Sequence, residues 1–495
     1  MGSKLEKFYP LFQSFTQFLL SKGWIYILLL SCILFFYQLI FHSSIEIGLA
    51  FASIPMTIYM GILMLSHPYT SFYLLFAANY ILLIISRLID IKLGASTLIF
   101  SLLILIAVIT RSVYEKIQWG KTYKAVYVLW GIWTLYCIAE IFNPNNIQEA
   151  WNIYSTMYIV YPFICFILVP LSIKSIQKIH ILLIIWVIFI LIMGIKGYWQ
   201  KNHGFTSSEL YWLYVEGGAR THLIWSGIRF FSFFTDAANF GVNMGMALVT
   251  FSISLIYIKN NILKILLLSG IIAAAYGLGI SGTRTAIAVP LAGLGFYIIL
   301  SGSKKAAISG VLSLTIFVGF FIFTTIGDSN QYIRKMRSAF RPTEDASYLV
   351  RVENRKKIAE YMVDKPFGYG IGLGGQGERF NPQKLMPIPP DSWLVNVWTD
   401  TGIIGVTLYC IIHVILFAWC SWILKYRIRN KQLRGLLTAW LCMNAGFFVA
   451  TYGNDVMQYP NAIIVYTGFA LCFAGVHIDK KLTEEEENKK NIPIL

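Results

Sequence analysis

The segment Ile179-His-Ile-Leu-Leu-Ile-Ile-Trp-Val-Ile-Phe-Ile-Leu-Ile-Met-Gly-Ile-Lys-Gly-Tyr198 decides the fold class of this chain. It is a nearly continuous apolar run, and an α-helix of about 20 such residues crosses a hydrocarbon layer about 30 Å thick. Similar runs recur along the sequence, in which 57% of the residues are hydrophobic and 13% are charged. A soluble protein carries about 25% charged residues. The sequence therefore predicts an all-α polytopic membrane protein.

We expect about fourteen transmembrane helices, because that number of apolar runs reaches spanning length. The runs cover residues 24–41, 46–65, 69–88, 94–112, 122–142, 153–172, 179–198, 237–258, 263–281, 285–302, 306–326, 401–424, 434–452 and 458–476. The first run lacks a small-residue cleavage site and is followed by further spans, so we expect a retained helix rather than a signal peptide. Three regions follow. Membrane helices fill 1–199, a core with outer loops 200–236 and 327–400 fills 200–425, and closing helices with a charged tail fill 426–495.

The distribution of basic residues predicts the orientation of the chain. Lys and Arg cluster in short segments on alternate sides of the spans, at 4–22, 111–124, 174–178, 259–264, 304–305, 425–434 and 480–481. The positive-inside rule assigns these segments and both termini to the cytoplasm, and both long loops to the outside. Arg87 and Lys92 are exceptions that fall outside. The cytoplasmic segments hold 22 basic and 7 acidic residues, which accounts for nearly all of the net charge of +16. The basic character therefore reflects topology and anionic lipid, not nucleic acid.

Arginines are concentrated at the predicted outer side. The first outer loop carries Arg220 and Arg229, the second carries Arg351 and Arg355, and Arg284 lies in a turn of small residues between two spans. Guanidinium groups bind phosphate in bidentate fashion and keep their charge. An arginine placed deep in a membrane protein is expected to face the protein interior or a wet cavity. We therefore predict an anion-binding cavity at this side.

The second outer loop is predicted to contain an amphipathic helix over about 346–363, which Pro366 prevents from continuing. The glycine-rich stretch that follows matches G-x-G-x-x-G at Gly370, Gly372 and Gly375. We reject a dinucleotide site there, because no buried strand precedes the motif and no βαβ unit surrounds it. A structural turn, or a loop whose backbone faces a ligand, is the expectation that remains.

Other polar residues of the outer loops allow more than one role. Asp236 is expected either to cap the helix that follows it or to act in catalysis. Glu216 and His222 lie near Arg220, and the pair Glu344-Asp345 is expected to cap a helix. No metal site is predicted, because the outer loops lack the spacing of metal ligands, and the seven cysteines all lie in apolar runs.

The chain resembles the O-antigen ligase/polymerase family of bacterial envelope enzymes. The resemblance rests on Ser281-Gly-Thr-Arg284, on Asp364-Lys-Pro-Phe-Gly-Tyr-Gly370 and on Thr401-Gly-Ile-Ile-Gly405, and it covers residues 200–410. It implies a helical bundle similar to that of C-type glycosyltransferases, a polyprenyl-pyrophosphate glycan as donor, and neither nucleotide sugar nor metal cofactor. The family loop commonly carries His-Asn where this chain has Asp391-Ser392. This difference favours a polymerase of repeat units over a ligase.

The resemblance and the arginines together suggest a mechanism. Arg229, Arg284, Arg351 and Arg355 are predicted to contact the donor pyrophosphate and to stabilise the charge that builds on it. Asp391, at the position of the family histidine, is the predicted general base. Secondary contacts are expected from Arg220, Glu216 and Asp236, and sugar stacking from Trp225, Trp393 and Trp398.

Three alternatives remain open at the level of sequence. A ligase would move the finished glycan to lipid A core or another acceptor. A flippase would use the same arginines to move the donor across the membrane without making a bond, and a non-catalytic assembly protein would use the loops to bind a partner. The expected partners are the lipid-linked oligosaccharide, membrane lipids and a chain-length regulator, in the inner membrane of a bacterium.

Overall fold

The computed structural model of the chain describes residues 23–42, 71–89, 94–114, 124–224, 227–301, 304–327, 331–338, 346–375 and 385–490, with a few positions between them. Within these ranges the chain is almost wholly helical, and its two short strands, β1 (Leu223–Ile224) and β2 (Gly227–Ile228), form one antiparallel pair. Nine helices of the described residues are long and apolar enough to cross a membrane. The all-α polytopic fold is confirmed, whereas the count of fourteen spans is not.

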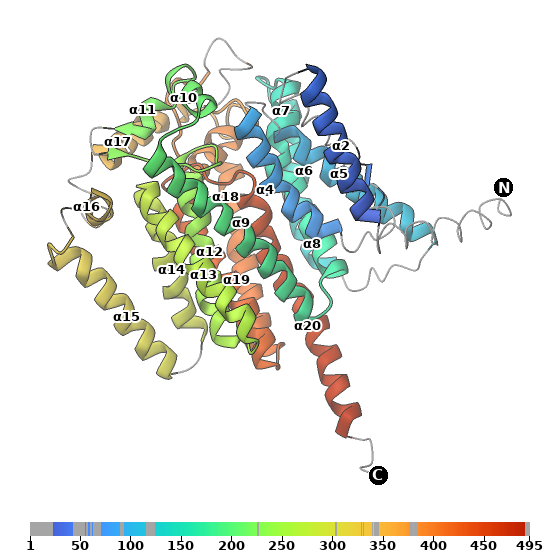
Figure 1. Ribbon diagram of the computed structural model, residues 1–495. Helices are drawn as coiled ribbons and strands as arrows, with labels where there is room; N and C mark the ends of the chain where they lie inside the picture. The colour runs from blue at the N-terminus through green and yellow to red at the C-terminus, as the bar shows by residue number, and fades with distance from the viewer. Residues whose placement is uncertain are drawn as a thin grey trace. The chain divides into compact units, whose positions relative to one another are not determined.

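Figure 1 follows the helices along the chain. In the first half they are α2 (Trp24–His42), α4 (Ser71–Ile89), α5 (Gly94–Tyr114), α6 (Lys124–Ala139), η3 (Glu140–Phe142), α7 (Gln148–Ser155), η4 (Thr156–Val160), α8 (Tyr161–Ser172), α9 (Ile176–His203), α10 (Ser207–Tyr214) and α11 (Ala219–His222). In the second half they are α12 (Ala237–Tyr257), α13 (Asn261–Ser281), α14 (Arg284–Leu300), α15 (Lys304–Phe323), α16 (Gln331–Ser338), α17 (Ala346–Tyr361), α18 (Trp393–Tyr426), α19 (Lys431–Thr451) and α20 (Asn461–Lys490).

Each predicted span coincides with a helix except 46–65, most of which lies outside the described residues. The predicted helix cap at Glu344-Asp345 also lies outside them. The largest difference is at α18, which begins at Trp393 and not at the predicted 401. The earlier start follows from Ser392, whose side chain accepts a hydrogen bond from the amide of Val395 and caps the helix. Within α18, Gly402 adopts φ 69° and interrupts the helical backbone.

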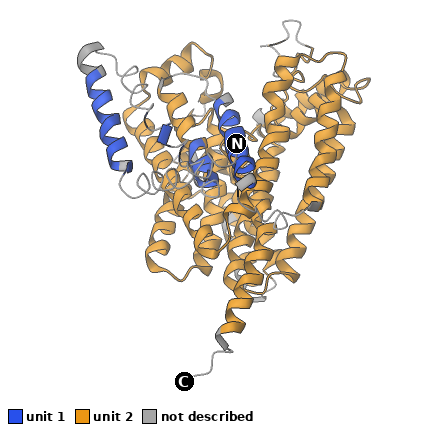
Figure 2. Cartoon of the chain, turned by 90° about the vertical axis from the view of Figure 1, so that its right-hand side faces the viewer, with its two compact units in different colours: residues 1–78, 96–119 blue, residues 79–95, 120–495 orange. Residues whose placement is uncertain are grey.

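The chain divides into two compact units, shown in different colours in Figure 2. One comprises residues 1–78 and 96–119, and the other comprises residues 79–95 and 120–495. The second unit contains both segments predicted as outer loops and the helices around them. The three-part division expected from composition stays a prediction.

The core of the second unit is built around α12, α13, α14 and α19. Trp186 of α9 packs against Trp440 of α19, with ring centroids 5.0 Å apart. Helices α14 and α19 approach closely at Gly446, where an added Cβ would collide with the backbone of Val289. Small residues permit this approach of membrane helices. The start of α14 and the end of α19 are therefore held side by side.

Helix direction decides where the connecting segments meet. Helices α12, α14 and α18 begin at one end of this unit, and α9, α13 and α19 end there, close to α10, α11 and α17 (Figure 1). The segments 204–236, 282–283 and 452–460 therefore lie at this end. The far part of α20 extends from the opposite end (Figure 1).

Candidate functional site

The segment between α9 and α12 is folded around a largely buried ion pair. Lys196, near the end of α9, lies 2.8 Å from the carboxylate of Glu209, and the two side chains are 11% and 1% exposed. Gln200 donates to Glu209 and to the carbonyl of Ser232, which fixes both sides of the loop. A buried pair of this kind is stable only when hydrogen bonds satisfy it, as they do here.

Arg87 of α4 anchors the same loop. Its guanidinium donates to the carbonyls of Phe234 and Thr235 and lies 4.5 Å from the ring centroid of Trp212 and 4.7 Å from that of Phe231. This arginine therefore lies at the same end of the unit as the two loops.

The glycine-rich stretch of the second loop is folded around a carboxylate. Asp400 accepts hydrogen bonds from the amide of Gly374 at 2.9 Å and from the hydroxyl of Tyr158 at 3.0 Å. Beside it, Ile358 of α17 and Met362, which directly follows that helix, pack with Leu373 in a small apolar core. The stretch thus serves as a structural turn, and no βαβ unit surrounds it in the described residues.

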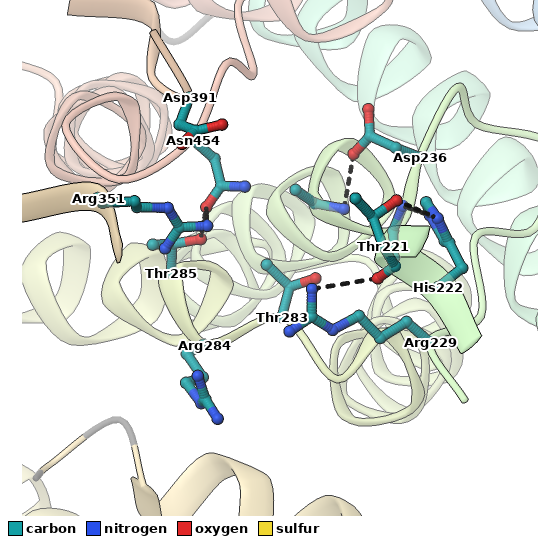
Figure 3. A pocket seen from close by; sticks show the side chains of 12 residues that line it. Thr221, His222, Arg229, Asp236, Thr283, Arg284, Thr285, Arg351, Asp391 and Asn454 are labelled. Carbon is teal, nitrogen blue, oxygen red and sulfur yellow. Dashed lines mark hydrogen bonds between the residues drawn. The ribbon is translucent and has the colours of Figure 1, made fainter. Parts of the chain in front are cut away.

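A cavity of about 200 Å³ lies where the two loops meet the helix ends. Its walls are Thr221, His222, Arg229, Asp236, Ala237, Ala238, Thr283, Arg284, Thr285, Arg351, Asp391 and Asn454 (Figure 3). These residues come from α11, from the segment after β2, from the starts of α12 and α14, from α17, and from the segments preceding α18 and following α19. The cavity is smaller than the roughly 300–1,000 Å³ of pockets that enclose a drug-sized ligand.

Three of the five predicted arginines line this cavity. Arg229 donates to the carbonyl of Thr221 at 3.3 Å, and Arg351 donates to Oδ1 of Asn454 at 3.4 Å. Figure 3 shows the side chain of Arg284 directed away from Asp391. The Nε atom of Arg284 donates to Ser338 Oγ, at the end of α16, at 2.8 Å. The cavity wall therefore carries three permanent positive charges from three different segments of the chain.

Asp236 caps α12, which is one of its two predicted roles. Its Oδ1 accepts hydrogen bonds from the amides of Ala238 and Asn239 at 2.7 and 2.9 Å. Its Oδ2 accepts from Thr235 Oγ1 at 3.0 Å and from Asn239 Nδ2 at 2.7 Å. Four donors thus occupy this carboxylate, which makes it a poor acceptor for a substrate proton.

His222 supports the same helix. Its Nε2 accepts a hydrogen bond from the amide of Ala237 at 3.0 Å, which leaves Nδ1 to donate to the carbonyl of Gly218 at 3.0 Å. The ring is buried, and burial lowers the pKa of His222 below its ordinary value, with the Arg229 guanidinium lowering it further and Asp236 opposing. A neutral ring with both nitrogens engaged is a structural support rather than a base.

Asp391 is the second carboxylate of the cavity wall. It is exposed, and its Oδ2 accepts one hydrogen bond, from Asn354 of α17, at 3.0 Å. Its backbone has φ 39°, an uncommon value for a residue other than glycine. Strained backbone of this kind is concentrated at functional sites.

Arg355 and Arg220 do not line the cavity. Arg355 donates to the carbonyl of Tyr452, and its guanidinium lies 4.0 Å from the ring centroid of that residue. Arg220 and Glu216 are exposed near α11. Their predicted contacts with substrate stay predictions, because nothing in the site geometry places them against the cavity.

Two of the tryptophans predicted to stack on sugars, Trp393 and Trp398, do not line the cavity. Trp393 is buried, donates to Tyr409 at 3.0 Å and stacks on Tyr158 with centroids 5.0 Å apart. Trp398 packs against the small apolar core of the second loop. Trp225 lies outside the described residues.

The sequence did not single out three polar residues of the cavity wall, Thr221, Thr285 and Asn454. Asn454 lies in the short turn between α19 and α20, for which the sequence predicts only a connection between two spans. The pair Asn454-Asp455 at the outer end of two apolar runs was the available signal. Asp455 is in the same turn, and burial and the nearby carboxylates of Asp236 and Asp400 raise its pKa to about 7.

The described residues contain no group of three or more His, Cys, Asp and Glu side chains that could hold a metal ion. No curated protein matches the chain at a significant level. The family model described as O-antigen ligase matches residues 268–410, a segment that includes Arg284, Arg351 and Asp391. This match supports an O-antigen ligase/polymerase-like family for this polytopic membrane protein.

Proposed function

We propose that this protein is a metal-independent glycosyltransferase that joins lipid-linked oligosaccharide repeat units into a bacterial surface polysaccharide. The donor is a polyprenyl-pyrophosphate glycan, and the reaction takes place at the outer face of the inner membrane. The observation that carries the proposal is the cavity whose wall includes Arg229, Arg284, Arg351 and Asp391. A compact cavity with three guanidinium groups suits a diphosphate.

The proposed step forms one glycosidic bond and breaks one. A hydroxyl oxygen of the acceptor sugar attacks the anomeric carbon of the donor, and the bond from that carbon to the pyrophosphate breaks. The electron pair leaves with the lipid pyrophosphate, where Arg229, Arg284 and Arg351 stabilise the growing charge. Asp391 takes the proton of the attacking hydroxyl as general base.

A ligase is the second candidate, since the matching family model is described as O-antigen ligase. The two reactions share the donor and the leaving group and differ in the acceptor. The presence of Asp391-Ser392, where the family commonly carries His-Asn, favours the polymerase. An assay that offers either a second lipid-linked repeat unit or lipid A core as acceptor separates the two.

The proposal is tested with purified protein in lipid vesicles that contain the lipid-linked repeat unit. Wild-type protein is expected to give a ladder of lipid-linked polymers, whereas a flippase would move the donor without forming new glycosidic bonds. Arg284→Ala should abolish the ladder. Arg284→Lys should reduce the rate by about 10- to 100-fold, because a point charge cannot replace the bidentate fork.

Ser338→Ala is the matched control for Arg284. It removes the acceptor of the Arg284 Nε hydrogen bond and leaves the guanidinium in place. This variant should keep most of its activity. Full activity of Arg284→Lys would show that bidentate phosphate binding at this position is wrong.

A further inference from the structure

Asn454 is a polar residue of the cavity wall that the function above does not use. It follows α19, and its backbone amide bonds to the carbonyl of Ala450, so the residue is fixed to the helix end. Its Oδ1 accepts hydrogen bonds from Thr285 Oγ1 at 2.6 Å and from Arg351 Nη2 at 3.4 Å. A single side chain thus connects α14, α17 and the turn before α20.

The chemistry of its neighbours determines the orientation of the Asn454 amide. Arginine has donors and no acceptor, so the atom facing Arg351 must be the carbonyl oxygen. The NH2 group then points the other way, into the cavity, as Figure 3 shows. Within the described residues the structure gives Nδ2 of Asn454 no hydrogen-bond partner.

We propose that Asn454 has two functions at the donor site, an inference that rests on the function proposed above. Its Oδ1 positions the guanidinium of Arg351, and its Nδ2 donates a hydrogen bond to a non-bridging oxygen of the donor pyrophosphate. The residue is therefore a donor-binding residue contributed by the turn between α19 and α20. This turn lies beyond the segment 268–410 that matches the family model.

Asn454→Asp separates the two functions, because the new carboxylate has the same shape as the amide. It can still accept hydrogen bonds from Thr285 and Arg351, so it keeps the arginine in place. It has no donor and adds a negative charge on the side that faces the cavity. Because the added charge by itself repels an anion, a loss of affinity in this variant supports the inference only together with a loss in Asn454→Ala.

The experiment measures binding of inorganic pyrophosphate to the full-length protein in lipid nanodiscs by calorimetric titration. Asn454→Ala should weaken binding by about 5- to 10-fold, because a net hydrogen bond is worth about 1 kcal/mol or slightly more. Asn454→Asp should weaken it more than 10-fold, with an unchanged thermal midpoint in the absence of pyrophosphate. Unchanged affinity in the aspartate variant would overturn the inference.

Two further variants keep this result interpretable. Asn430→Ala removes the cap at the other end of α19, where Oδ1 of Asn430 accepts from the amide of Leu433 at 3.0 Å. It should lower stability and leave pyrophosphate affinity unchanged. Arg351→Gln should weaken binding in any case. If the wild type binds no pyrophosphate, or Arg351→Gln binds it normally, the proposed anion site itself fails. If only the Asn454 variants bind normally, the proposed function stands and this inference falls.

Discussion

Replacement of His222 tests whether this residue supports α12 or transfers a proton. In His222→Gln, the side-chain oxygen can reach the position of Nε2 and continue to accept the hydrogen bond from the amide of Ala237. In His222→Ala, that amide is left buried without its acceptor, since Ala237 is 3% exposed. If His222 is a base, both variants lose it. If His222 is only a hydrogen-bond acceptor for the amide of Ala237, His222→Ala loses that acceptor and His222→Gln keeps it.

The expected stability changes follow from these contacts. A buried donor without its partner costs about 1–3 kcal/mol. The His222 ring also packs edge-to-face on Trp212 and Phe231, with centroids 4.9 and 5.3 Å apart. Each such ring contact is worth about 0.5–1.5 kcal/mol. We expect His222→Ala to lower the free energy of unfolding by about 3–5 kcal/mol. We expect His222→Gln to lower it by about 2–3 kcal/mol, because the ring contacts and the Nδ1 hydrogen bond to Gly218 are lost while the amide of Ala237 keeps an acceptor.

The assay combines unfolding in detergent with turnover measured well below both unfolding midpoints. His222→Gln should retain most of the wild-type rate, and His222→Ala should lose activity in parallel with its stability. A glutamine variant that is stable and yet as inactive as the alanine variant would refute the structural role and make His222 a catalytic residue.

The pH dependence of stability gives an independent check on His222. Because its pKa is lowered in the folded protein, the folded state binds fewer protons at this site than the unfolded state does. The contribution of the neutral His222 ring to the stability of the folded protein is therefore fully present above the ordinary histidine pKa of about 6.5, and it is lost as the pH falls below that value. His222→Gln should remove this component of the acid sensitivity.

Three further outcomes are expected. Asp391→Asn removes the proposed general base, so it should reduce turnover by about 10²- to 10⁴-fold in the vesicle assay and leave pyrophosphate affinity unchanged. Near-normal turnover would show that another residue is the base. Folding raises the pKa of Asp455 from 3.8 to about 7, so the protonated carboxyl stabilises the folded protein fully below pH 3.8, and this stabilisation is lost as the pH rises through 7. The thermal unfolding midpoint of the wild type should therefore fall over that pH range relative to Asp455→Asn, and parallel pH curves for the two proteins would contradict this. Gly402→Ala should lower the free energy of unfolding by at least about 2 kcal/mol, because Gly402 has φ 69° and an added Cβ would collide with the carbonyl of Pro366. Gly295→Ala is the control and should be neutral, because an added Cβ there meets open space, and equal effects of the two variants would contradict the reasoning.

Most helices of the described residues could be predicted from the sequence, because spanning length and apolar composition depend on local residues alone. A helix was expected over 346–363 and is present as α17 (Ala346–Tyr361), and the cap expected at Asp236 is present. The convergence of Arg229, Arg284 and Arg351 was also expected, since all three were assigned to one side of the membrane.

The partners of each side chain could not be predicted, because they depend on packing between segments far apart in the sequence. Nothing near Arg355 in the sequence indicates that it binds Tyr452, and nothing near Trp393 indicates that it is buried against Tyr158. Asn454 is 103 residues from the arginine that it holds, so only the tertiary structure connects them.

The residues that line the cavity come from several segments of the chain, of which the first contains Thr221 and the last contains Asn454. A growing polypeptide inserts these segments into the bilayer one after another, and the last wall arrives with the hairpin of α19 and α20. A half-inserted intermediate therefore lacks part of the cavity wall. The cavity is complete only when membrane integration of the chain is almost finished.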